Sequence, residues 1–424
     1  MKTPTQLPTE NLPYLTADVP AIPAAIKRRY EDFEVEEIPA YQPCGAGDHI
    51  YFTIEKAGLA TMRAVNDIAR ALDVNPRDIG VAGLKDARAV TRQMLSLEHA
   101  DPKTIAALQI PRIRIVSTTR HGNKLKIGHL RGNRFRIKLR EVEAGRLADI
   151  RAICDTLARR GVPNYFGAQR FGLRGDTGLM GLAILKNDPV AVIDMMLGRP
   201  GPHDTGPVLE ARKLYDAGDY SAAAKMWPYG FRDNVRACRE MARTGGKHKR
   251  AFYAVDARMK SFFVSAYQSQ LFNAVLARRL EQFDMILAGD LAMKHDNGAV
   301  FRVDDPAPEA ARAAAFEISP TGPIFGHRMT QPGGVMGEIE REVLADEGLS
   351  PEAFHDVRGM KLSGARRALR FAPKELAIDE GADEHGAFIE LRFALESGCY
   401  ATMLLREICK DKLGEGLDEG DATD

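Results

Sequence analysis

The chain of 424 residues has few cysteines and no long apolar run. Its five cysteines are scattered, odd in number and contain no C-x-x-C pair, which argues against a disulfide framework or a zinc knuckle. The ten histidines also lack metal-ligand spacing, so we expect no metal. No apolar stretch approaches the ~18–20 residues of a membrane-spanning helix, and the first residues are polar and proline-rich rather than signal-like. We therefore expect a cytoplasmic protein that does not enter a membrane.

Several sequence motifs of well-known enzyme classes are also missing. No G-x-G-x-x-G follows an expected strand, and neither a Walker A sequence nor a G-x-S-x-G elbow occurs. These absences disfavour dinucleotide-dependent enzymes, P-loop enzymes and α/β-hydrolases. We expect no organic cofactor.

Acidic residues are absent from the stretch between Pro102 and Arg140, although the net charge of the chain is only +1. Basic residues occupy ten of the 29 positions at its end, namely Arg112, Arg114, Arg120, Lys124, Lys126, Arg131, Arg134, Arg136, Lys138 and Arg140. A local excess of this size suggests a polyanionic partner, and an ordinary solvated face is the alternative. The last fourteen residues carry six acids and three glycines, which is typical of a disordered tail.

Hydrophobic periodicity predicts an α+β fold, in which helices lie on one side of a sheet. Strands are expected at 33–36, 49–54, 93–97, 134–140 and 388–393, and helices at 62–72 (with Thr61 as N-cap), 146–160, 177–185, 189–197, 209–217 and 256–281. Sheet segments at both ends with helices between them suggest an inserted, mainly helical domain. The expected parts are a flexible leader (1–19), a discontinuous sheet domain (20–163 and 361–410), an insertion (164–360) and an acidic disordered tail (411–424).

The most reactive-looking segment is the turn from Val81 to Gln93. Gly83 is expected to let the chain turn sharply out of a short strand, which would display Asp86 at the strand end. Lys85, Arg88 and Arg92 would surround this carboxylate with positive charge and keep it ionised. An ionised, oriented carboxylate suits covalent catalysis; capping of the turn or pairing with Arg88 is the alternative.

This turn resembles the nucleophile motif of the tRNA pseudouridine synthase D (TruD) family, G-x-K-D-[basic]-x-A-V-T-x-Q, with Ala87 at the usually basic position. Other family motifs follow in the same order along nearly the whole chain. They match at Lys27 with Glu31–Glu36, Gly132–Ile137, Asn164–Gly172, Gln268–Asn273, Pro320–Gly326 and Gly398–Glu407.

The resemblance implies a pseudouridine-synthase-like domain, with a mixed or antiparallel sheet and flanking helices, and an inserted, mainly helical TRUD domain. It also implies the isomerisation of uridine to pseudouridine in tRNA, expected at uridine 13. Asp86 would be the nucleophile, attacking either uracil C6 or sugar C1′. No cofactor or metal is needed for an isomerisation. The residue that removes the C5 proton is left open.

Six further residues are expected to contact the substrate. Phe135 would stack on a flipped uridine or pack in the core, and Asn133 would bind the uracil edge or hold the Asp86 loop. Tyr400 is a second aromatic candidate or a buried ring. Lys27 would contact a phosphate or pair with Asp86, and Lys85 and Arg88 complete the set.

Two other functions are consistent with these residues. One is a catalytically silent RNA-binding or RNA-folding protein, in which Asp86 would be dispensable. The other is an RNA hydrolase that uses Asp86 as a base. A hydrolase would shorten or depyrimidinate RNA, whereas an isomerase leaves the mass unchanged. We expect a monomer.

Overall fold

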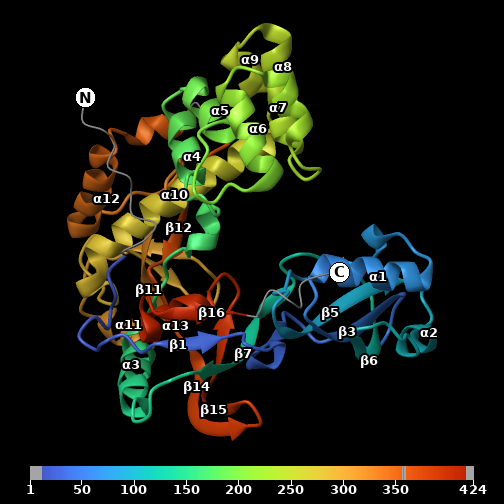
Figure 1. Cartoon of the computed structure of the whole chain (residues 1–424). Coiled ribbons are helices and arrows are strands. Elements are labelled where there is room, and N and C mark those ends of the chain that lie inside the picture. The colour runs from blue at the N-terminus through green and yellow to red at the C-terminus, as the bar shows by residue number, and fades with distance from the viewer. Residues whose placement is uncertain (1–11, 356, 358–359, 417–424) are drawn as a thin grey trace. The chain divides into compact units, whose positions relative to one another are not determined.

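The computed structural model describes residues 12–355, 357 and 360–416 (Figure 1). The chain divides into two compact units. One contains residues 14–162 and the chain from Phe371 onward, and the other contains Pro163–Arg370 with Leu12 and Pro13. The chain crosses between them at two short strands, β8 (Val162–Pro163) and β13 (Arg370–Phe371). Each unit is described by itself below.

The first unit, the sheet unit, is built on a mixed sheet with the strand order β14-β15-β7-β2-β5-β3-β6. β2 and β5 are parallel and the other neighbours in this order are antiparallel. Its strands are β1 (Ala24–Ile26), β2 (Phe33–Pro39), β3 (His49–Ala57), β4 (Gly80–Val81), β5 (Val90–Glu98), β6 (Ile113–His121), β7 (Leu130–Arg140), β14 (Lys374–Asp383), β15 (Gly386–Glu396) and β16 (Leu413–Glu415).

Helices cover part of the sheet. They are α1 (Thr61–Leu72), α2 (Pro102–Ala106), α3 (Leu147–Arg160) and α13 (Ala401–Cys409). The apolar stripe of α1, which includes Val65 and Ile68, packs on the isoleucines and Phe52 of β3 in a buried cluster, and Figure 1 shows α1 lying across β3 and β5. α3 packs against β14 and α13. This arrangement confirms the predicted α+β class.

The second unit, the insertion unit, is mainly helical and carries one small antiparallel sheet, β10-β9-β11-β12. Its helices are α4 (Thr177–Leu185), α5 (Pro189–Leu197), α6 (Gly206–Asp216), α7 (Tyr220–Met226), α8 (Arg232–Thr244), α9 (His248–Ala254), α10 (Ala257–Arg279), α11 (Ala310–Ala314) and α12 (Gly334–Asp346). Its strands are β9 (Leu291–Lys294), β10 (Val300–Arg302), β11 (Ile318–Ile324) and β12 (Ala365–Ala368). The long helix α10 packs along α4 and α12 (Figure 1).

The unit boundaries differ from the expected ones at three places. The return to the sheet unit comes at Phe371 rather than at 361, because β12 pairs with β11 inside the insertion. Thr16, expected in the flexible leader, is buried, and its hydroxyl and amide donate to Glu407. β16, expected in the acidic tail, pairs with β1. Residues 1–11 and 417–424, which hold most of the expected leader and tail, lie outside the described residues.

No helix among the residues that the structure describes is long and apolar enough to cross a membrane. The described residues also include no group of three or more His, Cys, Asp or Glu side chains that could hold a metal ion.

Candidate active site

Asp86 lies in the loop between β4 and β5, with about a third of its side chain (36%) exposed. One carboxylate oxygen, Oδ1, accepts a hydrogen bond from the backbone amide of Arg88 at 2.9 Å. The other, Oδ2, lies 2.6 Å from the ammonium nitrogen of Lys27. Both oxygens are therefore oriented, and the carboxylate still reaches solvent.

Lys27 directly follows β1 and is buried, with 6% of its surface exposed. Its ammonium nitrogen lies 4.6 Å from the ring centroid of Phe33 as well as against Asp86. Of the two roles expected for Lys27, the structure shows the pairing with Asp86.

The charge state of Asp86 follows from these neighbours. Partial burial raises the pKa of the carboxyl, but the hydrogen bond and the charge of Lys27 outweigh it, and the Arg88 amide and Lys56 add to the effect. The pKa of Asp86 is therefore held below its usual value, and the group is ionised at neutral pH.

Lys56, on β3, also holds the Asp86 loop, and the sequence did not predict this role. Only 1% of its surface is exposed, and its ammonium donates to the backbone oxygen of Asp86 at 3.0 Å and to that of Leu59. Burial lowers the pKa of Lys56 to about 8, while the charge of Asp86 raises it. The available signal was alternation: Lys56 continues the inward stripe of Ile50, Phe52 and Ile54 along β3.

Thr61 fixes the other side of the same loop. The sequence suggested it as the N-cap of α1, but the helix begins at Thr61 itself and Ala60 occupies the cap position without a side-chain bond. The Thr61 hydroxyl instead accepts from the backbone amide of Lys85 at 2.9 Å and donates to the side-chain oxygen of Gln93 at 2.9 Å. The expected cap therefore ties the Asp86 loop to α1 and β5.

Two of the expected cations point away from Asp86. Lys85 forms a buried ion pair with Glu37 at 2.6 Å, with both side chains less than 5% exposed. Arg92 pairs with Glu55 at 2.6 Å. Arg88 is exposed and contributes its backbone amide. The expectation that Lys85 and Arg92 neutralise Asp86 is therefore wrong, and Lys27 and Lys56 take this part.

Gly83 does not have the role that the sequence suggested either. It is absent from the glycines with positive φ, and an added Cβ would meet nothing closer than 3.6 Å. The turn therefore does not require a glycine at this position for backbone reasons.

Three phenylalanines form a cluster next to the Lys27–Asp86 pair. Phe135 on β7 stacks on Phe393 of β15 with centroids 5.3 Å apart, and it meets Phe33 edge-on at 6.3 Å. Phe135 is 8% exposed. Contacts thus run from Asp86 through Lys27 and Phe33 to Phe135. The sequence did not predict Phe393 as part of this cluster. It lies there because β15 pairs with β7 in a register that places Phe393 opposite Phe135.

Asn133 and Tyr400 lie in different surroundings. Asn133 precedes Phe135 by two on β7, and its side-chain oxygen is buried without a hydrogen-bond partner in the part of the chain that the structure describes. Tyr400 is 42% exposed just before α13, so it is not a buried ring. Among the described residues, its side chain makes no hydrogen bond or ring contact.

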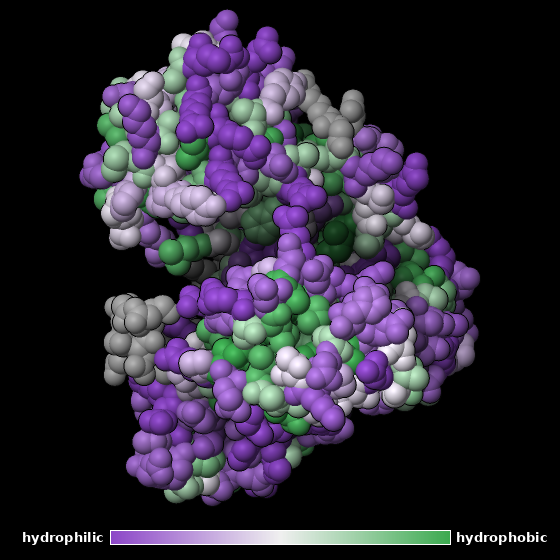
Figure 2. Space-filling view, turned by 90° about the vertical axis from the view of Figure 1, so that its right-hand side faces the viewer, coloured by the Kyte–Doolittle hydropathy of each residue, from purple (hydrophilic) through white to green (hydrophobic). Residues whose placement is uncertain are grey.

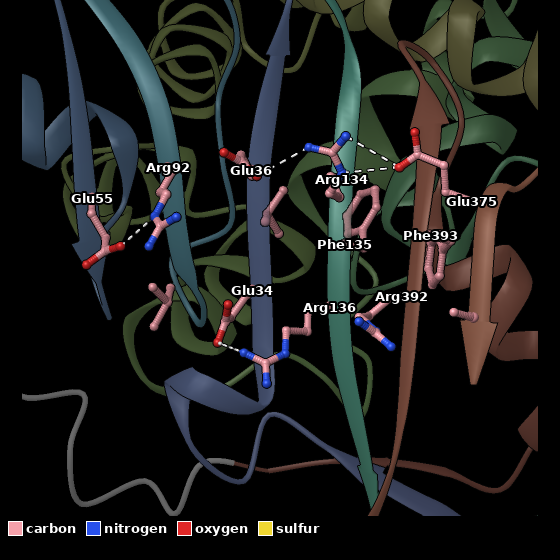
Figure 3. Close-up of a pocket in the computed structure, with 13 residues that line it drawn as sticks. Glu34, Glu36, Glu55, Arg92, Arg134, Phe135, Arg136, Glu375, Arg392 and Phe393 are labelled. Atoms are coloured by element: carbon pink, nitrogen blue, oxygen red, sulfur yellow. Dashed lines mark hydrogen bonds and ion pairs between the residues drawn. The ribbon is translucent and has the colours of Figure 1, made fainter. Parts of the chain in front are cut away.

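The opposite face of the sheet carries alternating charges, which we call the charge ladder (Figure 3). Arg134 pairs with Glu36 and Glu375, and Arg136 pairs with Glu34 and Glu390. A cavity of about 400 Å³ lies here. The expected basic surface is thereby reduced, because five of its ten cations have acidic partners, namely Arg114, Arg134, Arg136, Lys138 and Arg140.

Comparison with known proteins gives a consistent result. The family model described as "tRNA pseudouridine synthase D (TruD)" matches residues 10–408. The chain belongs to this family.

Its relatives include tRNA pseudouridine synthase D of Geobacter metallireducens, 44% identical over 94% of this chain and 97% of the relative, and that of Geotalea daltonii, 42% identical over 94% and 99%. A crystal structure of a TruD protein from Methanosarcina mazei superposes with a TM-score of 0.82 at 27% identity, covering 97% of this chain and 99% of that one. The TruD family membership makes this chain a pseudouridine synthase, an isomerase.

Proposed function

We propose that this TruD-family protein isomerises uridine to pseudouridine in tRNA, at the uridine 13 that the family resemblance suggests, with Asp86 as the nucleophile. The observation that carries the proposal is the geometry at Asp86. The carboxylate is ionised and held at both oxygens by Lys27 and the Arg88 amide, yet it remains partly open to solvent. These properties are what a covalent carboxylate nucleophile requires.

The reaction needs one nucleophile and no exchange of atoms with a co-substrate. Asp86 attacks either C1′ of the sugar or C6 of the base, and the bond between N1 and C1′ breaks. The detached uracil turns and forms a bond between C5 and C1′. The hydrogen on C5 leaves as a proton, N1 gains one, and the carboxylate is released unchanged.

Lys27 has a part in this charge movement. When Asp86 forms a covalent bond, its negative charge is lost and the buried ammonium of Lys27 loses its partner. Negative charge on the detached base would then lie near a fixed cation. Such a preorganised charge stabilises a transition state more than the same charge in water would.

The target uridine must leave the RNA stack, at a cost of a few kcal/mol. Phe135 is proposed to support the base, since stacking on an aromatic ring contributes about 1–3 kcal/mol. Asn133 offers a buried acceptor without a partner among the described residues, which suits the N3–H group of uracil. The exposed Arg88 and Tyr400 are proposed to contact RNA, and Lys85 is proposed to hold the loop through Glu37.

We further propose that the protein acts as a monomer in the cytoplasm, where tRNA is found. The decisive experiment is release of tritium from tRNA labelled at uridine C5. The wild type should release one tritium per tRNA and Asp86→Asn none. Asp78→Asn, the same change at an exposed aspartate in the same unit, should behave as the wild type.

The alternatives predict other results. Tight RNA binding without tritium release by the wild type would leave an RNA-binding protein. Shortened or depyrimidinated RNA would indicate a hydrolase. Release that continues after uridine 13 is replaced by cytidine would contradict the proposed position.

A further inference from the structure

The helical end of the insertion unit carries a strong excess of positive charge. Between Lys225 and Lys260 the sequence holds ten lysines and arginines against three acids. This segment covers the end of α7, all of α8 and α9, and the start of α10. We call it the basic tip. At the top of Figure 2, where α8 and α9 lie, the visible surface is predominantly hydrophilic.

Four arginines form a stripe along α8, at positions 232, 236, 239 and 243. Their spacing of four, three and four residues places them on one side of the helix, about one turn of ~5.4 Å apart. The opposite side, with Ala237, Cys238 and Met241, is buried. The stripe therefore faces solvent in a row, which suits a partner with regularly repeated negative charges.

The cations of α9 join this row. The two helices pack together, and the left-handed Gly245 ends α8 before the chain reverses. Arg243, and more weakly Arg250, lowers the pKa of Glu240, so Arg250 lies near the stripe. At the other end of α8, the backbone amide of Asp256 donates to Asp233 at 2.8 Å. The cations of α9 thus widen the basic surface beside α8.

Many of these cations lack an acidic partner. Arg236 pairs with Asp233 and Asp256, and Arg243 pairs with Glu240. Among the residues that the structure describes, no ion pair involves Lys225, Arg239, Lys249 or Arg250, and all four are exposed. This differs from the charge ladder, where acids from neighbouring strands neutralise the arginines.

An aromatic ring lies within the same segment. Tyr229, between α7 and α8, is 86% exposed. The guanidinium of Arg232 lies over its ring at 5.2 Å and donates to its hydroxyl at 2.9 Å. Such a pair offers a flat, cationic surface. RNA-binding proteins use aromatic rings and guanidinium planes to stack on unpaired bases.

We propose that the basic tip is a second RNA-contacting surface, which binds the phosphate backbone of the tRNA. This inference rests on the proposed function. The tip contributes affinity and has no part in the chemistry, because phosphate contacts position a nucleic acid without altering the reacting atoms.

The test compares two double variants with the wild type. Lys249→Ala/Arg250→Ala removes two unpartnered cations of the tip. The matched control, Arg341→Ala/Lys361→Ala, removes two exposed cations elsewhere in the insertion unit. Dissociation constants for an unmodified tRNA transcript are measured at several salt concentrations, and the rate of tritium release is measured at saturating enzyme.

The tip variant should bind tRNA roughly tenfold more weakly at 0.1 M salt. The slope of the logarithm of its binding constant against the logarithm of the salt concentration should be smaller by about 1.5–2, because the RNA keeps about one counterion at each phosphate that loses its contact. Its saturated rate and the control's binding should match the wild type. Unchanged affinity and slope, with the wild type active, would overturn the inference and leave the function standing. A fallen saturated rate would also overturn it. Tip-dependent binding without any tritium release would sink the function alone.

Discussion

Lys27 and Asp86 are 59 positions apart in the chain, yet their charged groups meet at 2.6 Å. Lys27 reaches this place with a left-handed backbone, φ 55°, which costs a non-glycine residue about 1 kcal/mol or more. The preceding strand β1 is held by pairing with β7 and with the C-terminal strand β16. The two ends of the chain thus cooperate in placing the partner of the proposed nucleophile.

Replacing Lys27 should change the pH dependence of the reaction. In Lys27→Met the burial that raises the pKa of Asp86 remains while the largest opposing cause is gone, so the acidic limb of the kcat/KM profile should move to higher pH. We expect kcat/KM at pH 7 to fall about 10- to 100-fold, the scale of a charge-assisted hydrogen bond of ~1.5–3 kcal/mol.

Two controls accompany this measurement. Arg28→Met changes the neighbouring residue, whose ion pair with Glu141 is exposed, and should leave the profile unaltered. Lys27→Arg should retain the limb near its wild-type position. An acidic limb that stays in place in Lys27→Met would show that Lys27 does not set the charge of Asp86.

Lys56 should make folding stability depend on pH in the alkaline range. Its pKa is about 8 in the folded protein against an ordinary 10.5, so the unfolded chain binds more protons between these values. The free energy of unfolding therefore gains a contribution that rises with pH from about 8 to 10.5. Lys56→Met should lose this rise, which urea unfolding of both proteins across the range would measure.

The same variant separates positioning from binding. Because Lys56 holds the backbone oxygen of Asp86, Lys56→Met should lower kcat with little change in KM for tRNA. If the difference in the free energy of unfolding between the wild type and Lys56→Met does not change with pH, Lys56 is not a buried ammonium with a lowered pKa.

The pair of Lys85 and Glu37 should matter for stability more than for RNA affinity. Lys85→Met leaves the Glu37 carboxylate buried without its cation, and breaking a buried pair in this way costs about 3–5 kcal/mol. The double variant Lys85→Met/Glu37→Met should recover most of that loss. Urea unfolding tests the first point. A variant with normal stability but weak tRNA binding would restore Lys85 as a substrate contact.

Much of the architecture was predictable because periodicity is local. The alternation along β7 and the apolar stripe of α3 are direct readings of residue spacing. The family motifs located Asp86 and Lys27 for the same reason, because each residue belongs to a motif of a few neighbouring residues. The helix expected at 189–197 also has these bounds in the structure, where the side chain of Asp188 caps its start.

The remainder depends on which strands become neighbours. Lys56 and Phe393 are not part of the sequence motif around Asp86. They lie in the site because β3 pairs with β5, and β15 with β7, in the observed register. Arg92 is close to Asp86 in the sequence, but its side chain lies on the face of β5 where it pairs with Glu55. The cations of β7 within the acid-free stretch are likewise neutralised, because acids on β2, β14 and β15 pair with them.

The charge ladder has a consequence for how the molecule meets a polyanion in solution. Charges of alternating sign cancel within a few ångströms, whereas an uncompensated cluster acts out to a screening length of about 8–10 Å at physiological salt. The ladder therefore exerts little pull on a diffusing RNA despite its many arginines. Encounters are biased toward surfaces whose cations remain unopposed, and their rate should fall as ionic strength rises.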